Sequence, residues 1–394
     1  MKGFPSPPEG QVTLANWRTG PFCRWAFHHV REIVPSADIA NEPDGVWHLD
    51  EALKDLSPVR FASQAGPQIS LEQYFGSDNT DALVVLHKGK LVHEAYPDGM
   101  AASVPHILMS VSKSVLALVA GIAIGDKALQ EEDPVEKHVP EITGTAFARS
   151  TVRDLLDMQV GVKFDEDYLA QSGPIIDYRK ATNWNPVESG DEVSDLRTFF
   201  TTLTEREDGY DGRFHYVSPC SDLLGWVVER AVGRRFADYM SDVLWKPLGA
   251  EFPAYITVDR LGAPRVAGGI CVAARDLARL GQLISLGGNR DGRQIIPQSW
   301  IDDIIENGSV DAWQRGDFSE DFTGMPLHYR SKWYVLRGDT RIVFGLGIHG
   351  QYVFIDQTND IVVAIMSSQA APVDIARLRD ALSLATAVMD HLKQ

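Results

Sequence analysis

Apolar residues along the chain follow a helical spacing through its middle and shorter, β-rich runs towards both ends. The run 105–121, PHILMSVSKSVLALVAG, is apolar except for a polar SVSK cluster and predicts a buried helix that begins near Ser110. A helix with Thr151 as its N-cap is predicted from TVRDLLDMQ, and one with Gly233 as its C-cap from SPCSDLLGWVVERAVG. Two further helices are predicted over residues 273–288 and 373–392.

Strand patterns lie on both sides of this helical block. Residues 81–96 read as a hairpin around Lys88-Gly89-Lys90, and residues 332–338, 341–350 and 351–368 are strand-like. We therefore expect the two ends of the chain to share one sheet, with the middle forming a lobe on it. This predicts an α+β fold with an antiparallel sheet flanked by helices. Residues 46–108 and 265–394 form the sheet domain, 109–264 a mainly helical lobe, and 1–45 an irregular N-terminal arm.

Composition narrows the classes of function. The chain has 394 residues, of which 44% are hydrophobic, and a net charge of −17, which argues against nucleic acid or an anionic membrane as partner. The longest apolar run is too short to span a bilayer, and the first ten residues lack the apolar segment of a secretory signal. The cysteines Cys23, Cys220 and Cys271 are too few and too far apart for a disulfide framework or a metal knuckle. We expect buried thiols, a cytoplasmic location, and no metal or cofactor.

The SVSK cluster is the main candidate for chemistry. Ser110 and Lys113 would share one helix face, where a desolvated lysine with a lowered pKa can take the proton of a serine nucleophile. The free N–H groups and the dipole at the helix start would support an oxyanion. The alternative is structural: Ser110 caps the helix and Lys113 reaches solvent. These residues alone leave both readings open.

Other hydrolase classes lack their motifs. There is no GxSxG elbow of a Ser-His-Asp α/β-hydrolase and no HExxH helix of a metallohydrolase.

Several segments together carry a family resemblance. LMSVSKSVLALVAG, EEDPVEKHVPEI, TVRDLLDMQVGV, FHYVSPCSDLLGWVVERAVG and GGICVAARDLARLGQLI occur in the order seen in the serine β-lactamase-like superfamily. The chain resembles the branch of class C β-lactamases and family VIII carboxylesterases, and within it the 6-aminohexanoate-dimer (nylon-oligomer) hydrolases. The resemblance spans roughly residues 20–390 and implies a β-lactamase/D,D-peptidase-like fold.

The resemblance also assigns roles. Ser110 matches the nucleophile, Lys113 its base, and Tyr216 in YVS the tyrosine that passes a proton to the leaving group. The N–H groups of Ser110 and Ile348 would form the oxyanion hole. A phenol beside an ammonium predicts a lowered pKa for Tyr216. Ser218 replaces the more usual asparagine of this motif.

The third motif of the family departs from its pattern. Gly345-Leu346-Gly347 stands where Lys-Thr-Gly usually lies on an edge strand of the cleft. The missing lysine puts recognition of a β-lactam or peptide carboxylate in doubt. His349 either contributes to the site or is a structural histidine.

A long, irregular loop over 164–185 matches the segment that covers substrate, with Tyr168 and Trp184 at enclosing aromatic positions. Arg179 stands where efficient amide-cleaving members have an aspartate, and Ala267 where they have an asparagine. Asp177 is an alternative match for that aspartate. Both departures favour ester cleavage.

The sequence thus predicts a serine hydrolase that acts through an acyl-enzyme on a small-molecule ester or amide. A homodimer is compatible with it. The rivals are a β-lactamase or D,D-peptidase, disfavoured by the missing lysine and export signal, and a non-catalytic binding descendant, disfavoured by the intact Ser110, Lys113 and Tyr216.

Overall fold

The computed structural model describes residues 1, 3–77, 79–97, 99–338 and 340–394, and its largest element is a seven-stranded antiparallel sheet. The strands lie in the order β11 (Leu327–Arg330), β12 (Trp333–Leu336), β13 (Ile342–Gly347), β14 (Gln351–Asp356), β15 (Ile361–Ser367), β4 (Thr80–His87) and β5 (Lys90–Ala95). Because β4 pairs with β15, with Ile365 opposite Leu83, the two ends of the chain share one sheet as predicted. The predicted hairpin is confirmed, with Lys88 and Gly89 at positive φ in its turn.

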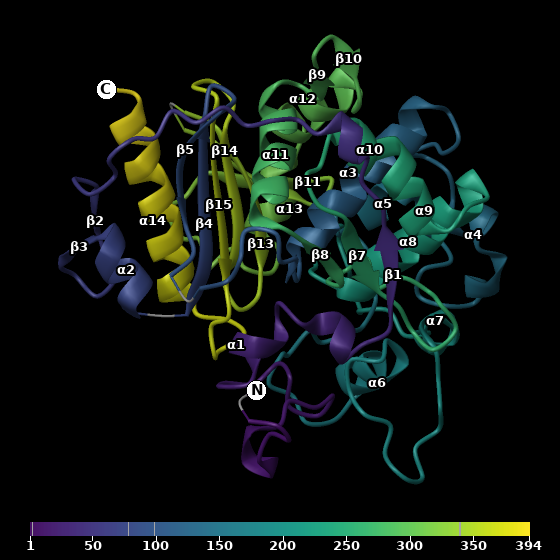
Figure 1. Ribbon diagram of the computed structural model, residues 1–394. Helices are drawn as coiled ribbons and strands as arrows, with labels where there is room; N and C mark the ends of the chain where they lie inside the picture. The colour runs from purple at the N-terminus through teal and green to yellow at the C-terminus, as the bar shows by residue number, and fades with distance from the viewer. Residues whose placement is uncertain (2, 78, 98, 339) are drawn as a thin grey trace.

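Helices cover both faces of this sheet (Figure 1). Helix α14 (Ile375–Leu392) lies on one face, and α11 (Ala274–Ser285) packs on the other against β4, β14 and β15. Helix α3 (Val111–Gly125) contacts β13 and β14 on one side and α8 of the helical lobe on the other. Because α3 is enclosed from both sides, it is apolar nearly all round, which explains the long apolar run in the sequence.

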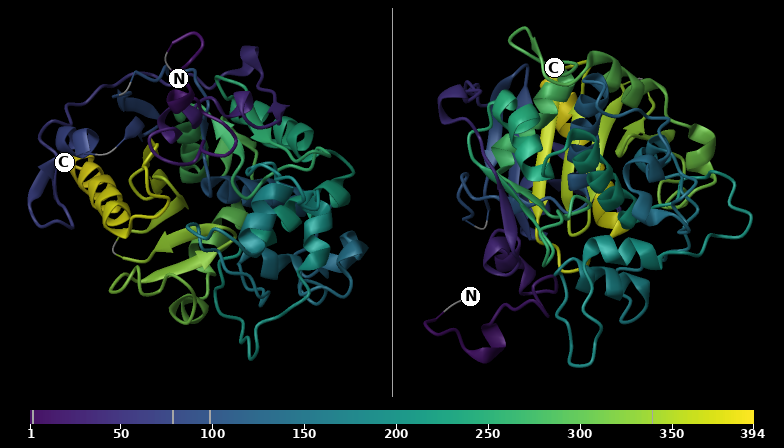
Figure 2. Two further views of the ribbon diagram at one scale, coloured as in Figure 1. Left: turned by 90° about the horizontal axis from the view of Figure 1, so that it is seen from below. Right: turned by 90° about the vertical axis from the view of Figure 1, so that its right-hand side faces the viewer.

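The middle of the chain forms the helical lobe, which lies beside the sheet in Figure 1 and in front of it in the right view of Figure 2. Its helices are α4 (Val135–His138), α5 (Val152–Leu156), α6 (Pro174–Ala181), α7 (Leu196–Thr202), α8 (Ser218–Val232), α9 (Phe236–Met240) and α10 (Lys246–Leu248). Thr151 caps α5 in a capping box with Asp154, and Gly233 ends α8 in a left-handed conformation, as the sequence predicted. The remaining helices are α1 (Cys23–Ala26), α2 (Leu71–Ser77), α12 (Gln298–Glu306) and α13 (Val310–Gln314).

A second sheet of four strands was not predicted. It runs β1 (Ser36–Ile39), β7 (Ala254–Thr257), β8 (Ile270–Val272), β6 (His106–Ile107), and therefore ties the N-terminal arm to the body. Strand β1 buries only Ile39 fully, so it shows no alternation that a sequence reading could detect. Small two-stranded sheets join β2 (Arg60–Ala62) to β3 (Gln68–Ser70) and β9 (Asn289–Arg290) to β10 (Arg293–Gln294).

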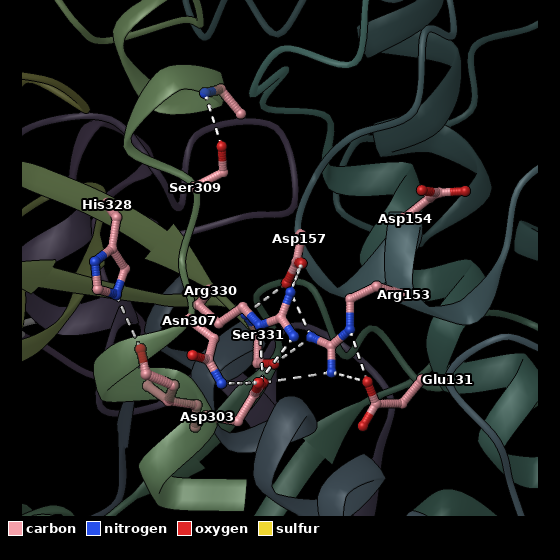
Figure 3. Close-up of polar contacts among 12 residues, drawn as sticks. Glu131, Arg153, Asp154, Asp157, Asp303, Asn307, Ser309, His328, Arg330 and Ser331 are labelled. Carbon is pink, nitrogen blue, oxygen red and sulfur yellow. Dashed lines mark hydrogen bonds and ion pairs between the residues drawn. The ribbon is translucent and has the colours of Figure 1, made fainter.

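An ionic network fastens the lobe to the end of the large sheet (Figure 3). Asp157, just after α5, accepts from the Arg153 and Arg330 side chains at 3.0 and 2.7 Å and from the Ser331 backbone N–H at 2.8 Å. Ser331 and Lys332 form the β11–β12 turn, both at positive φ. The network thus holds a tight turn that places the Lys332 side chain in the interior.

Three findings bear on the sequence expectations. Within the described residues, no helix has the length and apolar character to cross a membrane. The same residues contain no group of three or more His, Cys, Asp or Glu side chains placed to hold a metal ion. Cys23, Cys220 and Cys271 are free and buried, as predicted.

Candidate active site

Ser110 stands at the start of α3, directly after Met109, whose φ of +45° is unusual for a non-glycine residue. The Ser110 side chain makes no capping hydrogen bond. Lys113 is only 2% exposed, and its Nζ lies 2.7 Å from Ser110 Oγ and 2.8 Å from the Ala267 carbonyl oxygen. The structural reading of this pair, a cap and a solvent-reaching lysine, is therefore wrong.

Burial is the main reason why the pKa of Lys113 falls to about 7. The carboxylates of Glu166 and Asp222 oppose this shift, and the cations of Arg265 and Lys332 add to it. At neutral pH about half of the Lys113 side chains are therefore free amines, the form that can accept a proton from Ser110.

A buried network fixes the carbonyl that holds Lys113. The Ala267 N–H donates to Asp222 Oδ1 at 2.7 Å, and Asp222 also binds the Tyr178 hydroxyl at 2.5 Å and the Arg265 guanidinium. Sequence reasoning missed this network. The available signal was Asp222 itself, an acidic residue one helical turn after Ser218 in the buried first part of α8.

Tyr216 lies two residues before α8, is 6% exposed, and lines the same recess as Ser110. Lys113 Nζ is 4.9 Å from the centre of its ring. The expectation of a lowered pKa is wrong: burial and the nearby Glu166 carboxylate raise the pKa of Tyr216 well above its usual range. Tyr216 is therefore a neutral phenol at physiological pH, able to donate its proton.

Glu166 is a further charged residue of the site that the sequence did not single out. It accepts from the Ser218 N–H at 2.7 Å, from the Ser218 hydroxyl, and from the Tyr168 hydroxyl at 3.2 Å. Ser218, which stands where the family resemblance places an asparagine, thus faces the Glu166 carboxylate. Because Glu166 lies between Asp165 and Asp167, nothing in the sequence distinguishes it from its neighbours.

The third motif was expected on an edge strand, and β13 is an edge only at its end, over residues 345–347. Strand β12 pairs with β13 up to Phe344, and residues 345–347 then pair with β14 alone. A Cβ on Gly347 would meet the Leu108 carbonyl at 2.6 Å and the Ser110 nitrogen at 3.1 Å, so glycine permits β13 to approach Ser110. Within the described part of the chain, the N–H groups of Ser110 and Ile348 donate to no backbone acceptor.

Ser110 and Ile348 open onto two recesses. The larger, of about 640 Å³, is mainly apolar and includes Tyr168, Tyr216, Phe318, Phe322, Tyr334, Leu346, Tyr352 and Ile375. The smaller, of about 410 Å³, includes Arg18, Tyr168, Tyr178, Arg179, Trp184, Arg265 and Ala267. The structure thus brings Tyr168, Trp184, Arg179 and Ala267 to the cleft of Ser110.

The loop over 164–185 is less irregular than expected. Helix α6 occupies Pro174–Ala181, with proline in its first turn and the buried residues Ile175, Tyr178 and Arg179 on one face. Asp177 on this helix is exposed and lines neither recess, so it cannot take the place assigned to Arg179.

His349 lies in the turn after β13, not on a strand, and outside both recesses. It is 2% exposed, and its Nδ1 lies 2.7 Å from the Gln369 carbonyl oxygen. Burial lowers the pKa of His349 to about 4, which keeps the ring neutral. The structural role of this histidine is therefore the one that the geometry supports.

Comparisons with known proteins agree with this geometry. The sequence signature described as Beta-lactamase matches residues 71–387. The chain is 33% identical to the 6-aminohexanoate-dimer hydrolase of Paenarthrobacter ureafaciens, over 94% of this chain and 91% of that protein.

Solved structures are similar as well. One structure, from Bacillus anthracis, is a 6-aminohexanoate-dimer hydrolase by name only. It superposes with a TM-score of 0.88 at 25% identity, and the match covers 98% of this chain and 99% of that one. EstCE1, a hydrolase with promiscuous acyltransferase activity, shares the fold with a TM-score of 0.61 at 17% identity, covering 80% of this chain and 96% of its own. The chain therefore belongs to the beta-lactamase family and is a serine hydrolase.

Proposed function

We propose that the protein hydrolyses short-chain carboxylic esters, and linear amides more weakly, through an acyl-enzyme on Ser110. The observation that carries this proposal is the contact between Lys113 Nζ and Ser110 Oγ, with Tyr216 lining the same recess as this serine. A hydroxyl with a neutral amine on one side and a phenol on the other has both a proton acceptor and a proton donor within reach.

In the proposed reaction, Ser110 Oγ forms a bond to the substrate carbonyl carbon while its proton passes to the Lys113 amine. The N–H groups of Ser110 and Ile348 bind the resulting oxyanion, and each such donor typically contributes about 3–4 kcal/mol. Tyr216 then protonates the leaving alcohol or amine and recovers a proton from the Lys113 ammonium. Water releases the acid from Ser110 by the same steps in reverse order.

The preference for esters follows from the difference between leaving groups. An amine must be protonated as its bond breaks, so the nitrogen has to be held close to Tyr216, whereas an alkoxide departs with less help. The relatives named as 6-aminohexanoate-dimer hydrolases make a linear amide a natural second substrate. The residues Arg179 and Ala267 at the smaller recess differ from the aspartate and asparagine of efficient amide-cleaving members. We further propose a cytoplasmic location, which the three free cysteines favour.

The test is a substrate panel of 4-nitrophenyl butyrate, 6-aminohexanoate dimer and a chromogenic cephalosporin. We expect ester turnover that is lost in Ser110→Ala, weak turnover of the dimer, and no turnover of the cephalosporin. Faster turnover of the cephalosporin than of the ester would assign the protein to the β-lactamases instead. Absence of turnover on all three substrates would favour a binding protein.

A further inference from the structure

The smaller recess beside Ser110 gathers three guanidinium groups. Arg18 comes from the N-terminal arm, Arg179 from α6, and Arg265 from the segment before β8. Arg265 forms a buried ion pair with Asp222, which balances its charge. The remaining carboxylate of the recess, Glu166, is directed at Ser218 and Tyr168.

Arg18 and Arg179 have neutral hydrogen-bond partners instead. Arg18 Nη2 donates to Asn185 Oδ1 at 2.5 Å, and Arg179 Nη2 donates to the Tyr168 carbonyl at 3.0 Å. Among the described residues, neither arginine has a carboxylate within 4 Å, and the buried Arg18 Nε has no partner. Burial and the charges of the other two arginines lower the pKa of Arg18 to about 9. Arg179 is buried and Arg18 half-buried, and the Glu166 carboxylate offsets only part of the charge of the three guanidinium groups that line this recess. The recess is therefore suited to an anion.

The two recesses differ in charge. The larger one is lined by the acidic residues Asp321 and Asp374 and by no lysine or arginine of the described chain. A substrate with one anionic end would therefore be attracted to the smaller recess and repelled from the larger. Both recesses reach Ser110, so this difference orients the substrate across the nucleophile.

The position of Tyr216 indicates which part of the substrate enters each recess. Tyr216 lines the larger recess and not the smaller, and in the proposed mechanism it protonates the leaving group. The leaving alcohol or amine thus lies on the side of the larger recess, and the acyl chain extends into the smaller one.

We infer that Arg18 and Arg179 bind a carboxylate at the far end of the substrate's acyl chain, so that the substrate class is the monoesters or monoamides of short dicarboxylic acids. This inference rests on the proposed function and specifies its substrate. Water and the substrate give the free dicarboxylate and an alcohol or amine. The planar guanidinium groups suit a carboxylate, which they can bind through paired N–H···O contacts.

Three ethyl esters with five-carbon acyl chains test the inference: ethyl hydrogen glutarate, ethyl pentanoate and ethyl 5-aminopentanoate. They end in an anion, a methyl group and a cation, respectively. At pH 7.5 we expect kcat/KM to be highest for the anionic ester, by roughly 10–100-fold over the cationic one, as charged hydrogen bonds of ordinary strength would give. Arg179→Asp should reverse this order, and Arg179→Met should remove the preference for the anionic ester.

Arg230→Asp is the matched control, because Arg230 is exposed on α8 and changes the net charge equally. It should leave the order of the three esters unchanged. Inhibition of the unaltered enzyme gives a readout without any variant: glutarate should inhibit ethyl pentanoate hydrolysis more strongly than pentanoate does.

Equal turnover of the three esters, or preference for the cationic one, would overturn the inference while the proposed esterase function stands. Equal inhibition by glutarate and pentanoate would overturn it as well. Absence of turnover on all three esters would overturn the proposed function together with the inference.

Discussion

Raising the pH from 5 to 9 is expected to switch on ester hydrolysis with a midpoint near pH 7, because Lys113 must be neutral to accept the Ser110 proton. The pKa of Lys113 is lowered from 10.5 to about 7, chiefly by burial. At pH 7 a lysine with the ordinary pKa would be neutral in roughly one molecule in 3,000, whereas Lys113 is neutral in about half. The lowered pKa thus raises the share of Lys113 that is a neutral amine at pH 7 by about three orders of magnitude.

The direction of the pH dependence follows from the form that reacts. Below the midpoint Lys113 carries a proton and cannot act as base, so kcat/KM should rise about tenfold per pH unit and level off above pH 8. Tyr216 adds no limb in this range, since its pKa is raised. The charged groups that influence Lys113 are Glu166, Asp222, Arg265 and Lys332.

The assay is kcat/KM for ethyl pentanoate between pH 5 and 9.5 at constant ionic strength, because this ester does not ionise itself. Circular dichroism at each pH checks that the protein stays folded. A flat profile over this range, or a limb still rising at pH 9.5, would refute the assignment of Lys113 as a desolvated base.

Four variants test other parts of the protein. Lys113→Ala and Tyr216→Phe should each lower ester kcat by roughly 10²–10⁴-fold with the fold intact, and near-full activity in either folded variant would make that residue structural. Lys332→Met should raise the free energy of unfolding by about 1–3 kcal/mol in urea titrations at pH 7. The substitution removes a buried ammonium that has no hydrogen-bond partner among the described residues, and burial lowers the pKa of this lysine to about 8. The parent should gain stability as the pH rises from 8 to 10.5, because in this range Lys332 still binds its proton in the unfolded chain but not in the folded protein. An equal gain in Lys332→Met would show that Lys332 is not the cause. The double variant with Arg179→Asp and Ala267→Asn should cleave 6-aminohexanoate dimer faster than the parent does, because the acyl part of this dimer ends in a cation. Unchanged amide turnover would show that these two positions do not set the preference between esters and amides.

Sequence reasoning succeeded where a local pattern carries the information. The apolar run around Ser110 predicted a buried helix, and the hairpin around Gly89 and the caps at Thr151 and Gly233 lie where turn and cap residues placed them. The pairing of strands from opposite ends of the chain followed from their apolar patterns on either side of a helical block.

The sequence could not reveal what arises only from tertiary packing. Arg18 reaches the site from an arm without periodic pattern, and Glu166 is one of three adjacent acidic residues. The direction of the Tyr216 pKa was mispredicted because the neighbouring ammonium was considered and the burial and the Glu166 carboxylate were not. Lys332 is buried in a turn that is held by the Asp157 network, a contact between distant segments.

Labelling with a fluorophosphonate, followed by peptide mass spectrometry, tests whether Ser110 is the nucleophile. We expect a single modified residue, Ser110, and no labelling of Ser110→Ala. Labelling of Lys113→Ala should be much slower than that of the parent, because the serine would lack its base. Modification of a different residue, or labelling that persists in Ser110→Ala, would show that Ser110 is not the nucleophile.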